Sequence, residues 1–230
     1  GNSVCIDYGK INNILFFCTC GVGFDAFVSL KFADSGKRGL LTYLENTLHE
    51  SLTYQPETYE IENEEGTVRH KAFLIACGNA SQYGNNAYIT PHASLTDGLM
   101  DITIMEPFTV LDVPSLSFQL FNKTLDQNSR IKTMRAKKIK IHRQHDGVMH
   151  FDGDPLMAGK ELEVEIIPAG LHVIASPKKR TKEESENLLQ VISNYFSGLH
   201  LKGEEMLAKR QSHLFELNRN LLGKLSKNKI

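Results

Sequence analysis

Residues 78–101, GNASQYGNNAYITPHASLTDGLMD, form the stretch on which the fold of this 230-residue chain depends. Apolar runs flank it, AFLIAC at 72–77 and MDITIM at 100–105, and each run is typical of a buried strand. A loop of about twenty residues inside a compact domain is usually functional or disordered. Because strands close it on both sides, we expect an ordered, functional loop; a long surface connection is the alternative. Several residues in it tolerate or fix unusual backbone angles: Gly78, Asn79, Gly84, Asn85, Asn86, Pro91, Asp97 and Gly98.

Short strand-like patterns lie on both sides of this loop. Their spacing favours a mainly β domain with some helix, an antiparallel β-sandwich or barrel over residues 1–176. A turn is expected at Gly9-Lys10, a hairpin turn at 63–66, and a break in the strand pattern at 21–26. The strands are expected at 2–20, 54–62, 68–77, 100–105, 137–142, 148–151, 162–167 and 170–175. Helical patterns cover 27–33, 37–52 and 110–121.

Residues 177–230 are predicted to form a helical tail. Thr181 and Glu184 make a capping box at its start. Leu207, Leu214 and Leu221 then recur every seven residues. We expect two helices that pack on their own domain or form a homodimer. Because the tail holds 11 basic and 6 acidic residues, transient binding to a membrane surface is a further use for it.

Composition excludes several classes of protein. The net charge of −1 provides no attraction to nucleic acid, so no nucleic-acid partner is expected. No apolar run approaches eighteen residues and no signal-peptide pattern is present, which favours a cytoplasmic protein, at most peripheral at the membrane. The cysteines at 5, 18, 20 and 77 form no C-x-x-C pair. They are expected to be buried free thiols, with Cys18 and Cys20 on one strand face.

Two acidic turns could carry chemistry. The turn at 94–101 places a carboxylate among loop carbonyls, which are the ligands that Mg²⁺ prefers; an Asx turn at Asp97-Gly98 is the commoner use. The turn at 151–155 places Asp152 and Asp154 after a strand, where they could share a general-base or metal task. An ordinary Asp-Gly turn is the alternative there. The sequence contains no H-E-x-x-H, G-x-S-x-G or Walker A pattern.

The order of these motifs resembles the C-terminal part of the diacylglycerol-kinase-like lipid kinases. This is the soluble bacterial type, related to sphingosine and ceramide kinases. The resemblance covers about residues 3–176. Its matching stretches are DYGKIN at 7–12, GVGFDA at 21–26, GNASQYGNNAYITPHASLTDGLMDI at 78–102, DGD at 152–154 and IIPAGLHVI at 166–174.

The resemblance implies half of a two-domain enzyme. In such kinases an N-terminal α/β domain binds ATP through a Gly-Gly-Asp-Gly-Thr motif, and a C-terminal β-sandwich carries the lipid pocket. This sequence contains no such motif. We therefore expect the nucleotide domain to be missing here, the full-length protein to be an ATP-dependent lipid kinase, and the isolated chain to be inactive.

The resemblance also implies roles for particular residues. The loop residues Ser94, Asp97 and Leu99 would hold a structural Mg²⁺ through one carboxylate and two backbone carbonyls. Asp154 would be the base for the lipid hydroxyl, with Asp152 as the competing candidate.

Further residues in the matching stretches carry binding roles by the same resemblance. Asp25, Asn79 and Tyr83 would bind the lipid substrate, and Asp7 would contact the cofactor. Two departures keep a second function open, a non-catalytic lipid-binding or interaction module. Asp154 stands where the family has Glu, and residues 83–86 read Tyr-Gly-Asn-Asn in place of Tyr-Gly-Gly-Gly.

Overall fold

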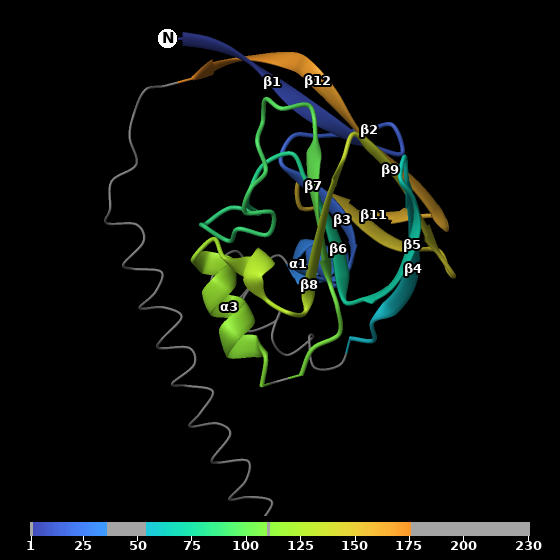
Figure 1. Ribbon diagram of the computed structural model, residues 1–230. Coiled ribbons are helices and arrows are strands. Elements are labelled where there is room, and N and C mark those ends of the chain that lie inside the picture. Colours follow the sequence, from blue (N-terminus) through green and yellow to red (C-terminus); the bar gives the residue numbers. More distant parts are fainter. Residues whose placement is uncertain (1, 36–53, 110, 176–230) are drawn as a thin grey trace, which may run out of the picture. The chain divides into compact units, whose positions relative to one another are not determined.

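The computed structural model describes residues 2–35, 54–109 and 111–175 (Figure 1). The described residues belong to one compact unit. The predicted helix at 37–52 and the predicted helical tail lie outside the described residues.

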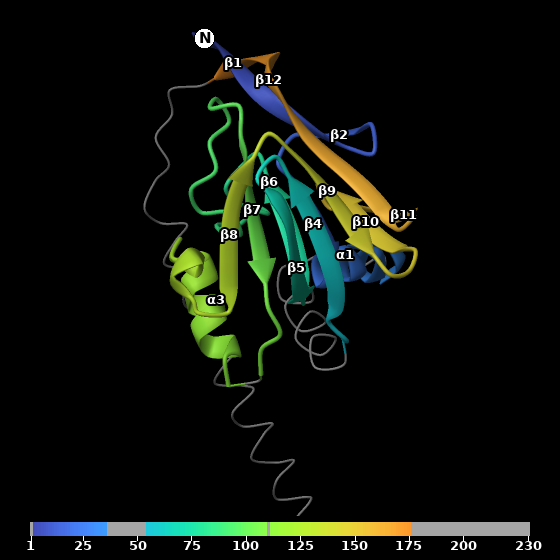
Figure 2. The same cartoon turned by 45° about the vertical axis from the view of Figure 1, so that its right-hand side comes forward.

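Two six-stranded antiparallel sheets make up the described unit, which confirms the predicted sandwich class (Figures 1 and 2). Sheet A has the order β2-β1-β12-β9-β4-β5, and sheet B the order β11-β10-β3-β6-β7-β8. Sheet A consists of β1 (Asn2–Ile11), β2 (Ile14–Phe16), β4 (Glu57–Asn63), β5 (Gly66–Ala72), β9 (Lys138–Arg143) and β12 (Glu161–Ala175). Sheet B consists of β3 (Thr19–Gly23), β6 (Leu74–Gly78), β7 (Met100–Met105), β8 (Ile131–Ala136), β10 (Gly147–Phe151) and β11 (Asp154–Ala158).

The main core lies between the two sheets. In β9 the side chains alternate, so that Ile139 and Ile141 are buried while Lys138 and Lys140 face solvent. The same period of two brings inward-facing residues of both sheets into one cluster, and each fully buried aliphatic side chain contributes about 1.5–3 kcal/mol. Representative members are Ile11, Val22, Ile61, Ile75, Ile102, Ile141 and Val164.

A second apolar layer covers the other face of sheet B. It contains α1 (Phe24–Ser35), α3 (Val113–Phe121) and the short 3-10 helix η1 (Leu125–Gln127). Helix α1 packs mainly on β11, β10 and β3, and η1 packs on β8 (Figure 2). Sheet B is therefore covered on both faces, and β3 and β6 are buried along their whole length. In the described part of the chain, no helix is long and apolar enough to cross a membrane.

Helix α1 begins earlier than predicted. Gly21–Gly23 continue β3, and Gly23, at φ +101°, turns the chain directly into the helix at Phe24. The break therefore comes at Gly23, and the helix starts three residues before the predicted Phe27. Helix α3 is confirmed in part: it starts at Val113, and Pro114 lies in its first turn, where the missing N–H does no harm.

The predicted strand at 68–77 proved to be two strands in different sheets. β5 belongs to sheet A and β6 to sheet B, and the chain crosses between the sheets at Phe73. There the Phe73 amide donates to the Met105 carbonyl, while the Phe73 carbonyl accepts the Phe24 amide. A continuous apolar run hides such a corner, because a period of two cannot show which sheet a residue joins.

The predicted turn at Gly9-Lys10 is also wrong. β1 runs through Gly9, and the chain turns at Asn12 and Asn13, which adopt φ of 46° and 67°. Gly9 is needed for a different reason, since a Cβ there would lie 2.0 Å from the ring of Phe16. The turn at 63–66 is confirmed, with the Asn63 side chain accepting two backbone amides.

The remaining predictions on strands and thiols are confirmed only in part. The patterns at 162–167 and 170–175 join into the single strand β12, while β8 and β11 were not predicted. Cys20 and Cys77 are buried free thiols, as predicted. Cys18 is exposed because it precedes β3, so it does not share a strand face with Cys20.

Candidate functional site

The long loop and the Asp152 turn meet at one end of sheet B. Because neighbouring strands are antiparallel, Gly78 at the end of β6 pairs with Asp101 in β7 and with Thr19 at the start of β3. Phe151 at the end of β10 pairs with Cys20. The fold thereby brings the predicted motifs into one region.

Asp7 fastens the loop to sheet A. A register irregularity between Ile6 and Tyr8 takes Asp7 out of the β1–β12 ladder and turns its side chain inward, where the residue is 2 % exposed. Its amide donates to the Leu95 carbonyl, and its carboxylate accepts the amides of Gly98 and Ala169, all at 2.7 Å. Asp7 thus holds the loop in place, and its contact with the cofactor stays a prediction.

Asn79 joins this network to the connection before β3. Its side-chain amide donates to the carbonyls of Asp7 at 2.9 Å and Phe17 at 2.8 Å, and its backbone amide donates to Cys18. The residue is fully buried, and within the described ranges its Oδ1 has no partner. Asn79 therefore positions the backbone; substrate binding through it stays a prediction.

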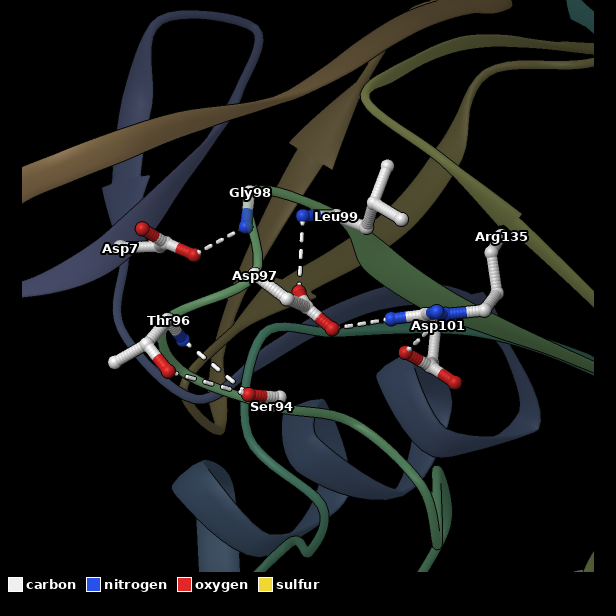
Figure 3. A network of polar contacts seen from close by, with 8 residues as sticks. All are labelled: Asp7, Ser94, Thr96, Asp97, Gly98, Leu99, Asp101 and Arg135. Carbon is white, nitrogen blue, oxygen red and sulfur yellow. Dashed lines mark hydrogen bonds and ion pairs between the residues drawn. The ribbon is translucent and has the colours of Figure 1, made fainter.

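The Asp97 turn forms the polar network drawn in Figure 3. One carboxylate oxygen of Asp97 accepts the Leu99 amide at 3.1 Å, and the other is paired with Arg135. Arg135 also donates to Asp101, at 3.1 Å. Burial raises the pKa of Asp101, and the neighbouring Arg135 opposes that rise.

The donor set of this turn fits a hard divalent cation. The residues named by the resemblance, Ser94, Asp97 and Leu99, would supply only oxygen ligands, as Mg²⁺ prefers. The loop that carries them is already fixed by Asp7 through Gly98. Over the ranges 2–35, 54–109 and 111–175, no group of three or more His, Cys, Asp or Glu side chains is arranged to bind a metal. Backbone carbonyls and water would thus have to complete the coordination.

The second acidic turn separates the two catalytic candidates. Asp152 and Gly153 form a two-residue hairpin loop with positive φ at both positions, 48° and 93°. The Asp152 carboxylate accepts the amides of Phe17 at 2.7 Å, Cys18 at 2.7 Å and Thr19 at 3.0 Å. Asp154, the first residue of β11, is exposed. Asp152 is exposed as well, but its carboxylate is engaged as a clamp on residues 17–19.

Asp25 and Tyr83, two predicted substrate-binding residues, lie in contact. The Tyr83 hydroxyl donates to Asp25 Oδ2 at 2.7 Å, and His150 Nε2 lies 3.0 Å from the same oxygen. The side chains of Asp25 and His150 are only 8 % and 2 % exposed. Gly21, paired with His150 across the ladder, makes room for them, because a Cβ there would lie 2.8 Å from the Asp25 carboxylate.

Two residues of these networks were missed by sequence reasoning. His150 directly precedes the turn at 151–155, and that position was the signal that could have found it. Arg135 lies in β8, a strand that was not predicted, so its position directly across from Asp101 could not be predicted either. Both residues were missed because their partners are distant in the sequence.

The described unit is thus an antiparallel sandwich that brings two acidic turns together at one end of sheet B. The model of the YegS C-terminal NAD kinase beta sandwich-like domain matches residues 18–175. This chain belongs to that family.

The chain is also similar to named relatives and to solved structures. Proteins named "Probable lipid kinase YegS" from Escherichia coli strain SMS-3-5 and Shigella boydii serotype 18 are 28 % identical over 180 residues, 77 % of this chain and 58 % of each relative. The chain thus spans little more than half the length of these relatives. The crystal structure of a diacylglycerol kinase from Bacillus anthracis strain Sterne matches with a TM-score of 0.55 at 16 % identity, covering 76 % of this chain and 55 % of that one. A second crystal structure from the same strain gives 0.58 at 18 % identity, covering 76 % and 57 %. These two likenesses concern the fold.

Proposed function

We propose that this chain is the lipid-binding and catalytic-base half of a Mg²⁺-dependent kinase that transfers the γ-phosphoryl group of ATP to a lipid hydroxyl, as in a diacylglycerol. One observation carries the proposal: in a chain of the YegS domain family, the Asp152 turn exposes one carboxylate and clamps the other. Because the relatives are longer than the matched region, ATP binding is assigned mainly to residues outside it.

Asp154 is the proposed general base. Its carboxylate accepts the proton of the lipid hydroxyl, the hydroxyl oxygen forms a bond to the γ-phosphorus, and the bond from that phosphorus to the bridging oxygen of ADP breaks. Asp152 supports this step indirectly, since its three amide contacts fix the hairpin that carries Asp154. Mg²⁺, when bound, would neutralise developing phosphate charge, and a structural ion would be held at Ser94, Asp97 and Leu99.

Exposed apolar side chains near the turn support access to a lipid at a membrane surface. Phe17, whose amide contacts Asp152, is 42 % exposed, and Met157 in β11 is 62 % exposed. Leu15 and Leu156 are exposed on the same two segments. Transient contact of these side chains with a bilayer would bring the acceptor hydroxyl to the turn. A homodimer through the tail stays a prediction.

The test is phosphoryl transfer from labelled ATP to a short-chain diacylglycerol by the full-length protein that contains this chain. Asp154→Asn keeps the size of the side chain and removes the base, so kcat should fall by about 10²-fold or more with ATP binding little changed. Thermal unfolding of the variant should be unaltered, because Asp154 is exposed.

Asp152→Asn is the matched control. It should lower thermal stability, since an amide nitrogen replaces one acceptor oxygen of the clamp. Near-normal kcat in Asp154→Asn would remove Asp154 from its role. Lipid binding without any phosphoryl transfer by the full-length protein would favour the non-catalytic module instead.

A further inference from the structure

Arg135 places a cation where the Asp97 turn would hold a metal. Its guanidinium is paired with Asp97 and donates to Asp101, so one side chain bridges two carboxylates (Figure 3). The position is fixed by the fold, because Arg135 in β8 lies directly across the ladder from Asp101 in β7.

The two partners of Arg135 differ in how they are held. The Asp101 side chain is 14 % exposed and belongs to a strand in the centre of the β6-β7-β8 ladder. The Asp97 side chain is 33 % exposed and belongs to a loop. A guanidinium that loses Asp97 therefore keeps a well-placed partner in Asp101.

The loop does not depend on a bound ion for its shape. Asp7 accepts the Gly98 amide and donates to the Leu95 carbonyl, so the backbone on both sides of Asp97 is fixed from sheet A. The backbone at Asp97 consequently stays in place, while the carboxylate can turn from one cation to another.

We propose that Arg135 is an intramolecular competitor for a divalent cation at Asp97, which weakens metal binding there. This inference rests on the metal site in the proposed function. With no ion bound, Asp97 and Asp101 share the guanidinium. When a divalent cation binds, Asp97 turns to the ion and Asp101 alone retains Arg135. A guanidinium about 4 Å from the ion repels it, by an amount that corresponds to a fivefold loss of affinity or more.

The experiment is a titration of the 230-residue chain with MgCl2, followed by calorimetry and by the NMR signal of the Arg135 Nε–H group. Arg135→Gln removes the competing charge and keeps a polar side chain. Arg130→Gln is the matched control, because Arg130 is similarly exposed but pairs with Asp112. Asp97→Asn removes the carboxylate ligand, and thermal unfolding confirms that each variant is folded.

We expect Arg135→Gln to bind Mg²⁺ at least about fivefold more tightly than the unaltered chain. Arg130→Gln should change the dissociation constant less than twofold, and Asp97→Asn should abolish binding. Added Mg²⁺ should shift the Arg135 Nε–H signal of the unaltered chain.

Three results would overturn the inference. Equal dissociation constants in Arg135→Gln and the unaltered chain would show that Arg135 does not compete with the ion, while the metal site itself would stand. Tight binding that survives in the Asp97→Asn, Arg135→Gln double variant would place the ion elsewhere. Absence of Mg²⁺ binding in every variant would remove the metal site itself, and the phosphoryl-transfer assay would then judge the catalytic proposal separately.

Discussion

Asp25 and Asp97 make nearly the same set of contacts in very different surroundings. Each carboxylate accepts a nearby backbone amide and contacts a basic side chain, His150 in one case and Arg135 in the other. The Asp25 and His150 side chains are almost fully buried, with 8 % and 2 % of their surface exposed. The Asp97 and Arg135 side chains are 33 % and 46 % exposed.

This difference in solvent access decides what each pair does. Removing one partner of a buried pair leaves the other without compensation, so the buried contact is strongly required once it exists. An exposed pair contributes little, because water and salt replace it. The Asp25 pair is therefore expected to hold structure, whereas the Asp97 pair is free to exchange one cation for another.

The largest effect is expected from His150→Leu. The change removes one partner of the nearly buried Asp25 carboxylate. It should lower the free energy of unfolding by roughly 3 kcal/mol. His150→Gln is the matched control, since its side-chain amide can still donate to Asp25 and should restore much of the stability. Urea unfolding of the three proteins measures both changes.

A similar loss in His150→Leu and His150→Gln would show that the contact to Asp25 is not what matters. An unchanged stability in His150→Leu would remove the contrast between the two pairs altogether.

Tyr83→Phe should have an intermediate effect. The variant removes one hydrogen bond to the Asp25 carboxylate and keeps the ring, which lies edge-on to His150 at 6.0 Å. Because Tyr83 is 37 % exposed, water can replace its hydroxyl, and the loss should be about 1 kcal/mol. If urea unfolding gave a loss as large as that of His150→Leu, the phenol would be part of the buried pair and not its solvent-facing edge.

The sequence predicted the elements whose evidence is local. β7 was found with its observed bounds, and the hairpin at 63–66 was found from its turn residues. The long loop was recognised from its backbone chemistry, and Gly84, Asn85, Asn86 and Gly98 do adopt positive φ there. These features depend on a few neighbouring residues, so periodicity and turn chemistry suffice.

The sequence could not predict what depends on distant pairing. The crossing between the sheets at Phe73 cannot be recognised within a continuous apolar run. Strand β8 was not predicted because its burial does not alternate regularly. Asp25 and Tyr83 were predicted separately, but only the fold shows that they meet at His150. The three amide contacts of Asp152 likewise involve residues more than 130 positions away.

The smallest effect on stability is expected from Arg135→Gln in the absence of divalent ions. Its pairing with Asp97 is exposed to solvent, and Asp7 fixes the loop independently, so the loss should be below about 1 kcal/mol at moderate salt. Raising the salt concentration from 0.1 M to 1 M shortens the screening length from about 10 Å to about 3 Å. The difference in unfolding free energy between Arg135→Gln and the unaltered chain should therefore shrink further. The loss in His150→Leu should stay nearly constant, because the Asp25 pair is shielded from the solution.

Urea unfolding at both salt concentrations makes this comparison directly. A salt-independent loss of several kcal/mol in Arg135→Gln would mean that the guanidinium supports the loop itself, and a guanidinium so firmly required could not give way to a metal ion.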